Sequence, residues 1–146
     1  MNTNAYSIDI FCDFAGTGGT FAGCAAALKQ ANPSTRCYLV EPTYAAALAG
    51  ERVTNPYHHI QGGGYGIATL KLLERATIDG YVTVSDSEAI ETARELARSE
   101  GIFAGFSTGA NVAALRKLLE SICAGGTAVA IASDSGLKYL STDLWS

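Results

Sequence analysis

The segment Gly16-Thr17-Gly18-Gly19-Thr20 has the composition of a loop that binds an anion. Glycines allow several backbone N–H groups to point into one concavity, and a helix that begins there adds partial positive charge. The hydroxyls of Thr17 and Thr20 supply further donors. The loop is neither of the GK[ST] nor of the G-x-G-x-x-G type. It therefore predicts a binding site for a phosphate group, and the alternative is a strand-to-helix turn without a ligand.

Three further segments contain residue types that bind ligands. Ser107-Thr108-Gly109 is expected at a second strand-to-helix junction, where a serine most often caps the helix. The run Gln61-Gly62-Gly63-Gly64-Tyr65-Gly66 permits a positive φ and close approach of the backbone to a ligand, or else forms a flexible loop. Asp134 and Ser135 follow an apolar segment and either contact a ligand or cap the next helix.

Other common chemistries find no support in the sequence. It contains no G-x-S-x-G elbow and no H-E-x-x-H motif. His58 and His59 are adjacent and have no carboxylate or thiol at ligand spacing, so no metal site is predicted. The four cysteines form no C-x-x-C pair and have apolar neighbours, which favours buried, reduced thiols.

Composition narrows the class of protein. The chain has 146 residues, 48% of them hydrophobic, a net charge of −4 and a pI near 5.0. These values favour one folded domain over residues 1–146 and argue against disorder and against nucleic acid as a partner. No stretch of about 20 apolar residues predicts a membrane span, and the N-terminus lacks the pattern of a secretory leader. We therefore expect a cytoplasmic protein.

Short apolar runs alternate with helical patterns along the chain. Strands are expected at 7–12, 37–41, 81–84 and 128–132, and helices at 21–31, 44–49, 70–75, 86–100 and 110–122. Ser85 and Glu88 form a capping box at the start of the fourth helix. This alternation is typical of the α/β class, a three-layer αβα arrangement around a parallel sheet. In such sheets ligands bind beyond the carboxyl ends of the strands.

Five motifs in fixed order carry a more specific resemblance. They are GTGGTFAG, VEP, HHIQGGGYG, VSDSEAIETARELARSEGIFAGFSTGA and DSGLKYLSTDLW. Together they resemble the C-terminal half of cysteine synthase (O-acetylserine sulfhydrylase) and its relatives, including cystathionine β-synthase. These are pyridoxal-phosphate enzymes of the tryptophan-synthase β-like fold, also called fold type II. The resemblance implies part of that fold's large domain.

The resemblance also implies roles for individual residues. Gly16, Thr17, Gly18, Gly19 and Thr20 would hold the 5′-phosphate of pyridoxal 5′-phosphate. Ser107 would form a hydrogen bond at the pyridine nitrogen, where a neutral hydroxyl leaves the ring unprotonated and favours β-replacement. The loop with Gln61, Gly62 and Gly63 would line the substrate side. Asp134 and Ser135 would lie behind the residues that contact the cofactor.

Other features depart from the family's pattern. The lysine that binds the cofactor covalently lies far upstream of the phosphate loop in the family, and no lysine precedes Gly16 here. Lys29, Lys71, Lys117 and Lys138 are all interpreted as solvated surface residues. Asp13-Phe14 replaces small or apolar residues, which would bring a carboxylate close to the phosphate and crowd the turn. His59 stands where relatives often have lysine.

The resemblance therefore predicts part of an enzyme that makes cysteine from O-acetylserine, or a related activated serine, and sulfide. No catalytic residue is assigned within the chain. Expected partners are an N-terminal half or second chain that brings the lysine, and further copies in a homo-oligomer. The main alternative is a non-catalytic homologue that binds a peptide, such as the tail of serine acetyltransferase. A phosphate-binding α/β domain unrelated to pyridoxal is a third hypothesis.

Overall fold

The computed structural model describes residues 7–146, which form a parallel sheet with helices on both sides. The strands are β1 (Ile10–Phe14), β2 (Arg36–Pro42), β3 (Gly80–Val84) and β4 (Ala128–Ala130). The helices are α1 (Gly19–Ala31), α2 (Asp86–Ser99) and α3 (Phe106–Ile122), with short 3-10 turns η1 (Lys71–Leu73) and η2 (Gly136–Tyr139). This architecture confirms the expected α/β class. The expectation of no secretory leader falls largely on residues 1–6, outside the described residues.

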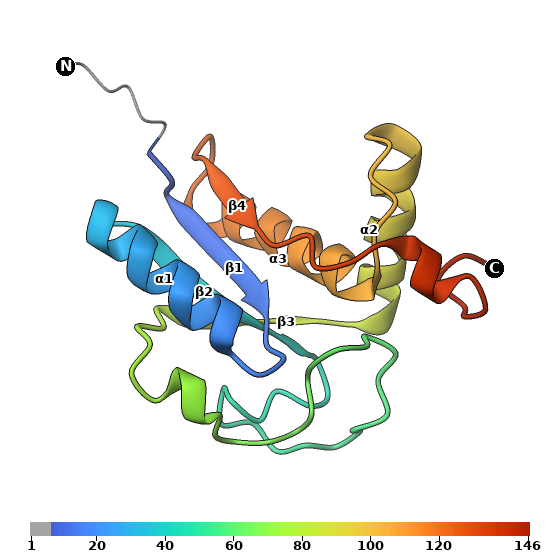
Figure 1. The fold of residues 1–146 in the computed structure, drawn as a ribbon, viewed down its shortest axis with the longest axis horizontal. Coiled ribbons are helices and arrows are strands. Elements are labelled where there is room, and N and C mark those ends of the chain that lie inside the picture. The colour runs from blue at the N-terminus through green and yellow to red at the C-terminus, as the bar shows by residue number, and fades with distance from the viewer. Residues whose placement is uncertain (1–6) are drawn as a thin grey trace.

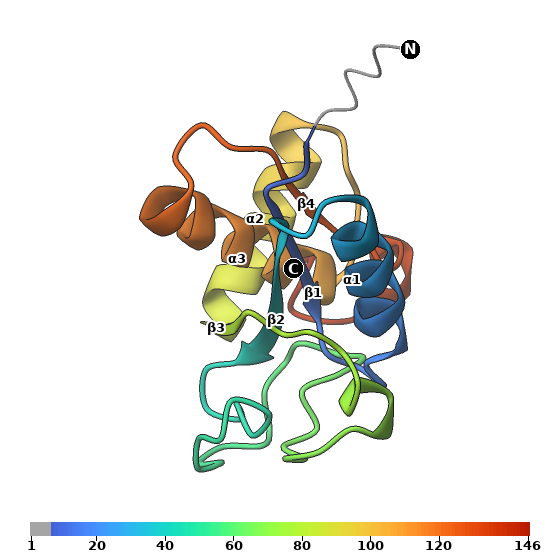
Figure 2. The ribbon, with the colours of Figure 1, turned by 90° about the vertical axis from the view of Figure 1, so that its left-hand side faces the viewer.

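The sheet separates two apolar layers. Ile10, Cys12 and Phe14 of β1 belong to a cluster with residues of α2 and α3, whereas Phe11 and Ala15 pack in a second cluster with α1. Successive residues of a strand point to opposite faces, so β1 contributes to both layers. Figures 1 and 2 show α1 on one side of the sheet and α2 with α3 on the other. The three-layer αβα arrangement is thereby confirmed.

The strand order β3-β2-β1-β4 creates a switch point beside β1. The chain runs from β1 to β2 and β3 on one side, then returns to place β4 on the other side of β1. The register of β1 with β4 ends at Cys12 opposite Ala130, so the two strands part beyond these residues. Crevices of this kind are where open α/β sheets bind ligands.

Helix α2 begins as its sequence predicts. Ser85 Oγ accepts the backbone N–H of Glu88 at 3.3 Å, and Glu88 Oε2 accepts the backbone N–H of Ser85 at 2.8 Å. The capping box is therefore confirmed. One face of α2, with Ala89, Ala93 and Leu96 buried, packs against α3.

Helix α3 begins earlier than predicted. It starts at Phe106 with Gly105 as its N-cap residue, so Ser107-Thr108-Gly109 lies inside its first turn. The sequence interpretation of this segment as a turn, with Ser107 as the cap, is wrong. Gly109 serves helix packing, since a Cβ there would collide with the carbonyl oxygen of Ala89 in α2. The glycine reflects close approach of two helices and not a chain reversal.

Other element boundaries also differ. The first strand covers 10–14 where 7–12 was predicted, and β4 ends at Ala130. Residues 44–49 form turns and no helix, because the buried carboxylate of Glu41 accepts the backbone N–H groups of Leu48 and Ala49 at 2.9 and 2.8 Å. A carboxylate that takes these donors competes with a helical ladder.

The cysteines and one lysine differ in burial from the prediction. Cys12 and Cys37 are buried and free, whereas Cys24 and Cys123 are free but only partly buried. Lys29 is only 18% exposed and forms an ion pair with Asp79 at 2.7 Å, so its interpretation as a solvated residue is wrong. In the described part of the chain, no helix has the length and apolar character needed to cross a membrane.

Candidate cofactor site

A cavity of about 240 Å³ lies at the switch point beside β1. Its wall is built from the end of β1, the loop that leads into α1, the start of α3 and the segments after Ile60 and after β4. These segments are distant in sequence, and they meet because parallel strands end at the same edge of the sheet. The cavity is thus the natural candidate for the functional site.

The loop between β1 and α1 provides donors for an anion. Gly18 has a φ of +85° and is the N-cap residue of α1, and Ala22 N–H is bonded to its carbonyl oxygen at 2.9 Å. The amide of Gly19 has only a long contact, 3.5 Å, to Thr17 Oγ1. Amides in the first turn of a helix have no partner within the helix. Thr17 and Thr20 are exposed and line the cavity, so their hydroxyls add to this set.

The glycine run after Ile60 packs directly on the loop between β1 and α1. Gly64 N–H donates to the carbonyl oxygen of Ala15 at 3.0 Å, and a Cβ at Gly16 would lie 2.8 Å from the carbonyl oxygen of Gly62. His58 Nε2 contacts the carbonyl oxygen of Gly64 at 2.8 Å. Close contact between two backbones explains why both segments need glycine, and it brings Gln61 and Gly62 to the cavity wall.

Ser107 lies at the cavity with its hydroxyl available. The residue is only 7% exposed, and its hydroxyl forms no hydrogen bond with any of residues 7–146. A helix cap would use this oxygen for a backbone amide, which does not occur here. The hydroxyl is therefore free to bind a ligand.

Asp13 is a buried carboxylate in the same wall. It is 5% exposed, and Asn111 Nδ2 donates to its Oδ1 at 3.3 Å. Burial raises the pKa of Asp13 to about 6, against the opposing effect of the Asn111 hydrogen bond. The adjacent Phe14 packs edge-on to His58, with ring centroids 6.4 Å apart. The Phe14 ring belongs to the apolar core cluster that includes residues of α2 and α3, so the core accommodates it.

The segment after β4 closes the cavity on its far side. Tyr139 Oη donates to Asp134 Oδ2 at 2.6 Å, and Lys138 Nζ lies 3.6 Å from the same oxygen. Burial, together with the hydrogen bond to Asp134, raises the pKa of Tyr139 to about 12. Ser133, Asp134, Lys138 and Tyr139 all line the cavity. Of these, only Asp134 was assigned a site role from the sequence, although polar residues directly after a buried strand are a usable signal.

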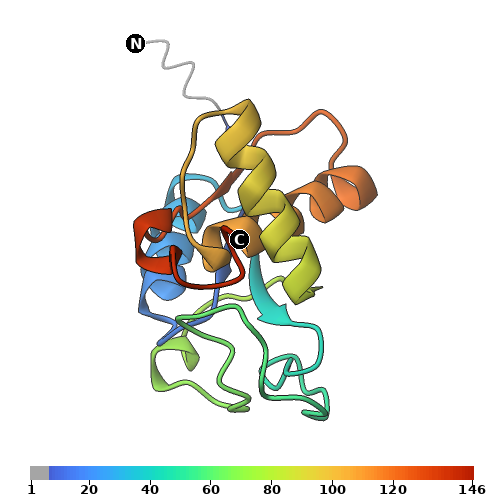
Figure 3. The same cartoon turned by 90° about the vertical axis from the view of Figure 1, so that its right-hand side faces the viewer.

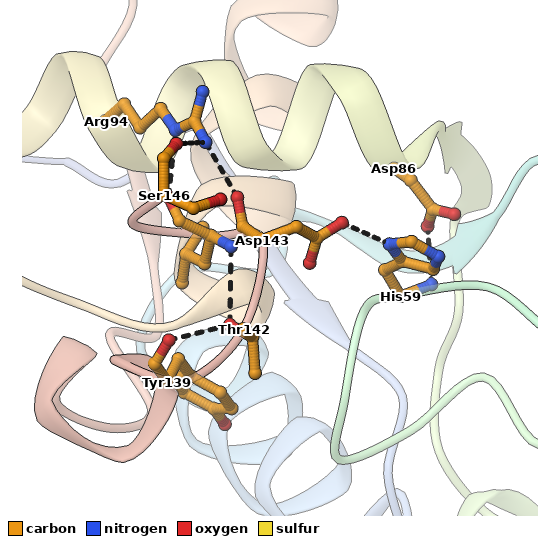
Figure 4. A network of polar contacts seen from close by, with 8 residues as sticks. His59, Asp86, Arg94, Tyr139, Thr142, Asp143 and Ser146 are labelled. Carbon is orange, nitrogen blue, oxygen red and sulfur yellow. Dashed lines mark hydrogen bonds and ion pairs between the residues drawn. The ribbon is translucent and has the colours of Figure 1, made fainter.

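Polar contacts fix this last segment on the rest of the fold. Arg94 of α2 donates to the carbonyl oxygens of Asp143, Leu144 and Ser146 at 2.7–2.8 Å. His59 Nδ1 contacts Asp143 Oδ2 at 2.6 Å, and its backbone N–H donates to Asp86 Oδ1 at 2.9 Å. Figure 4 shows these contacts, and Figure 3 shows the C-terminal segment beside α2. Two cavity-forming segments, those around His59 and Tyr139, are thus tied together.

The cavity includes most of the residues expected from the sequence. Those that line it are Gly16, Thr17, Gly18, Thr20, Gln61, Gly62, Ser107 and Asp134. Three others do not: Gly19 starts α1, Gly63 packs against the carbonyl of Ala15, and Ser135 accepts the amide of Leu137 at 3.2 Å as the cap of η2. Their roles toward a ligand stay predictions.

No group of three or more potential metal-binding side chains occurs within residues 7–146. Of the lysines, only Lys138 lines the cavity, and it is 66% exposed. The sequence interpretation treated it as surface alone and missed its position at the site.

Comparison with known proteins gives the class. The family model "Pyridoxal-phosphate dependent enzyme" matches residues 3–134. Cysteine synthase A of Escherichia coli (strain K12) is 40% identical over 145 residues, 94% of this chain and 45% of that protein. O-ureido-L-serine synthase of Streptomyces lavendulae is 40% identical over 139 residues, 94% of this chain and 42% of that protein. O-acetyl serine sulfhydrylase isoform 3 of Entamoeba histolytica superposes with a TM-score of 0.86 at 33% identity, over 95% of this chain and 41% of that one.

The chain therefore belongs to the pyridoxal-phosphate-dependent enzymes of fold type II. Within that class it matches the C-terminal half of the cysteine synthase family and spans less than half the length of these relatives. The hydrogen-bond donors of the site suit the cofactor of the family. Backbone amides and two threonine hydroxyls can receive a phosphate, and Ser107, whose hydroxyl has no hydrogen-bond partner within residues 7–146, lines the same cavity.

Proposed function

We propose that this chain is the cofactor-binding part of a cysteine synthase-like enzyme that replaces the β-substituent of O-acetylserine, or a related activated serine, with sulfide. The observation that carries the proposal is the convergence of the phosphate loop, the free Ser107 hydroxyl and the Gln61-Gly62 backbone on one cavity. Relatives at 40% identity are named cysteine synthases, which supports this reaction class.

The residues of this chain have separate tasks in the proposed reaction. The loop from Gly16 to Thr20 binds the phosphate and thereby anchors the cofactor. Ser107 orients the ring through its nitrogen. The loop with Gln61 and Gly62 borders the space for the amino-acid substrate and excludes water there. When bound, pyridoxal phosphate supplies the electron-withdrawing ring that β-replacement requires.

The proposed enzyme needs a second component. The cavity, at about 240 Å³, is smaller than the roughly 300–1,000 Å³ of typical small-molecule sites. Its single lysine, Lys138, is exposed and directed toward Asp134. We infer that a lysine-bearing polypeptide segment outside these 146 residues completes the wall and supplies the covalent attachment. A homo-oligomer of such completed units is part of the same proposal.

Calorimetric titration with pyridoxine 5′-phosphate tests the cofactor site, because this analogue lacks the aldehyde and needs no lysine. We expect saturable binding to the chain, with inorganic phosphate as a competitor. Absence of binding to a folded sample would refute the proposal.

Two further experiments test the reaction and the alternative. Borohydride treatment with pyridoxal phosphate should label no single lysine, and co-expression with the lysine-bearing part of a relative should produce cysteine from O-acetylserine and sulfide. If co-expression gives an intact complex without activity, and a serine acetyltransferase tail peptide binds instead, the chain is a non-catalytic peptide-binding homologue.

A further inference from the structure

His59 joins two segments that line the cavity and are distant from each other in the sequence. Its Nδ1 lies 2.6 Å from Asp143 Oδ2, and its backbone N–H donates to Asp86 Oδ1 at 2.9 Å. Gln61 lies two residues beyond His59 and lines the cavity. Tyr139 lies four residues before Asp143 and lines it as well. The contact between His59 and Asp143 therefore connects two walls of the site (Figure 4).

Both partners of His59 are anchored on helix α2. Arg94 of α2 donates to the backbone carbonyl oxygen of Asp143 at 2.7 Å, which holds the C-terminal segment on the helix. Asp86 lies in the first turn of the same helix. The two carboxylates thus belong to one support, and His59 attaches the loop with Gln61 and Gly62 to it.

The strength of this attachment depends on the charge of the imidazole. Histidine is the side chain that ordinarily changes charge between pH 5 and 8. A protonated ring adds Coulomb attraction to Asp143, whereas a neutral ring keeps the hydrogen bond alone. The side chains of His59 and Asp143 are 54% and 48% exposed, so solvent screens this attraction and its effect is modest.

Two other anchors of the loop have no group that titrates. Ile60 is fully buried in the apolar core, and the Gly64 N–H donates to the carbonyl oxygen of Ala15 at 3.0 Å. These contacts keep the loop near the cavity at every pH. The ion pair of His59 adds a hold that changes with pH.

We propose that His59 is a positioning residue: when its imidazole takes up a proton, the loop with Gln61 and Gly62 is held more firmly and a phosphate ester binds more tightly at the cavity. The proton comes from solvent and stays on the ring. A loop that is ordered in advance costs less to fix when the ligand binds, which raises the apparent affinity. This inference rests on the proposed function, which supplies the ligand.

Other groups near the cavity titrate in the same pH range. Burial raises the pKa of Asp13 to about 6. His58 contacts the carbonyl oxygen of Gly64, and the phosphate of the ligand has its second ionisation near pH 6. His59→Lys leaves all of these in place and stays charged throughout the range. The difference between this variant and the unmodified chain therefore reports the charge of His59.

Amide exchange measured by mass spectrometry in residues 60–66 tests the hold on the loop. The unmodified chain is compared with His59→Lys and His59→Gln at pH 6 and at pH 8. At pH 6 we expect the unmodified chain to match His59→Lys and to exchange about two- to fivefold more slowly than His59→Gln. At pH 8 it should approach His59→Gln, while His59→Lys stays slow. Equal exchange in all three chains at both pH values would overturn the proposal.

Calorimetric titration of the same three chains with pyridoxine 5′-phosphate tests the effect on the ligand. The ratio of the affinities of His59→Lys and the unmodified chain should be near one at pH 6 and rise by up to about fivefold at pH 8. A constant ratio would refute the role of His59 in positioning the ligand-binding loop. If the unmodified chain does not bind this ligand, the proposed cofactor site fails, whereas binding with a constant ratio contradicts this inference alone.

Two further variants separate the ion pair from a general loss of stability. In an Asp143→Asn background, the difference between histidine and glutamine at position 59 should disappear at pH 6, since the charge of the imidazole has lost its partner. Arg116→Gln is the matched control. It breaks an ion pair with Glu95 that is also 2.6 Å long and about half exposed but joins α3 to α2. If Arg116→Gln changed loop exchange or affinity as His59→Gln does, the proposal would be wrong.

Discussion

Asp13 gives the clearest expectation at the scale of single residues. Its pKa is about 6 in the folded chain and near 3.8 as an ordinary carboxyl, so the folded state holds the proton more tightly. A raised carboxyl pKa makes folding most favourable below pH 4, and that advantage is lost as the pH rises through 6. Burial of the charged group therefore destabilises the fold near neutral pH.

We predict that Asp13→Asn stabilises the chain at pH 7.5 by on the order of 2 kcal/mol, because it removes the buried charge. The gain should shrink as the pH falls from 6 and vanish below about 4, where the acid is neutral in both states. Urea unfolding at a series of pH values measures this. A gain that does not change with pH would contradict the assigned cause.

The Ser107 hydroxyl has two candidate roles, to cap helix α3 or to bind a ligand, and a substitution can distinguish them. Loss of a true N-cap side chain costs about 1 kcal/mol, whereas the Ser107 hydroxyl has no hydrogen bond within residues 7–146. We predict that Ser107→Ala changes the free energy of unfolding by less than about 0.5 kcal/mol and lowers the affinity for pyridoxine 5′-phosphate severalfold. Denaturation and calorimetry on the same sample check both values. A loss of 1 kcal/mol or more would restore the capping interpretation.

At the scale of elements, the turn between β1 and α1 depends on Gly18. Its φ is +85°, and a Cβ there would lie 2.6 Å from Leu73 Cγ in η1. We predict that Gly18→Ala destabilises the chain by about 1–2 kcal/mol and weakens phosphate binding, because the loop must shift. Gly23→Ala is the control, since it lies in the exposed part of α1 and its Cβ would meet no atom within 4 Å. That change should stabilise by about 0.5–1 kcal/mol and leave phosphate binding intact. Equal effects of both substitutions would contradict a special role for Gly18.

Local patterns predicted the elements where local forces decide them. The capping box at Ser85 and Glu88 fixed the start of α2 correctly, because both of its hydrogen bonds lie within four residues. The helix predicted at residues 44–49 was wrong because the side chain of Glu41, which belongs to the preceding strand β2, accepts the backbone N–H groups of Leu48 and Ala49. The predicted start of α3 was wrong because Gly109 was interpreted as part of a turn. It is a glycine because α2 packs closely against it, and no local pattern reveals that contact.

At the scale of the whole molecule, Arg94 holds the C-terminal segment against α2 through three carbonyl oxygens. We predict that Arg94→Met lowers the free energy of unfolding by about 1–2 kcal/mol and speeds amide exchange in residues 140–146. Exchange measured by mass spectrometry checks this. Arg98→Met is the control, because the one hydrogen bond that Arg98 donates within residues 7–146 goes to the Arg94 carbonyl of its own helix at 3.2 Å. Unchanged exchange in Arg94→Met would show that burial of Leu144 and stacking of Trp145 on Phe103 suffice.

The sequence by itself determined the α/β class, the glycine-rich loop at Gly16–Thr20 and the shortage of lysines, since these depend on composition and on neighbours along the chain. Tertiary structure alone decided what meets at the switch point. It joined Asp13 to Asn111, placed Lys138 at the cavity and showed Ser107 to be free of capping. The reason is physical: these contacts join segments up to about a hundred residues apart, and burial, which sets the charge of Asp13, arises only when they pack together.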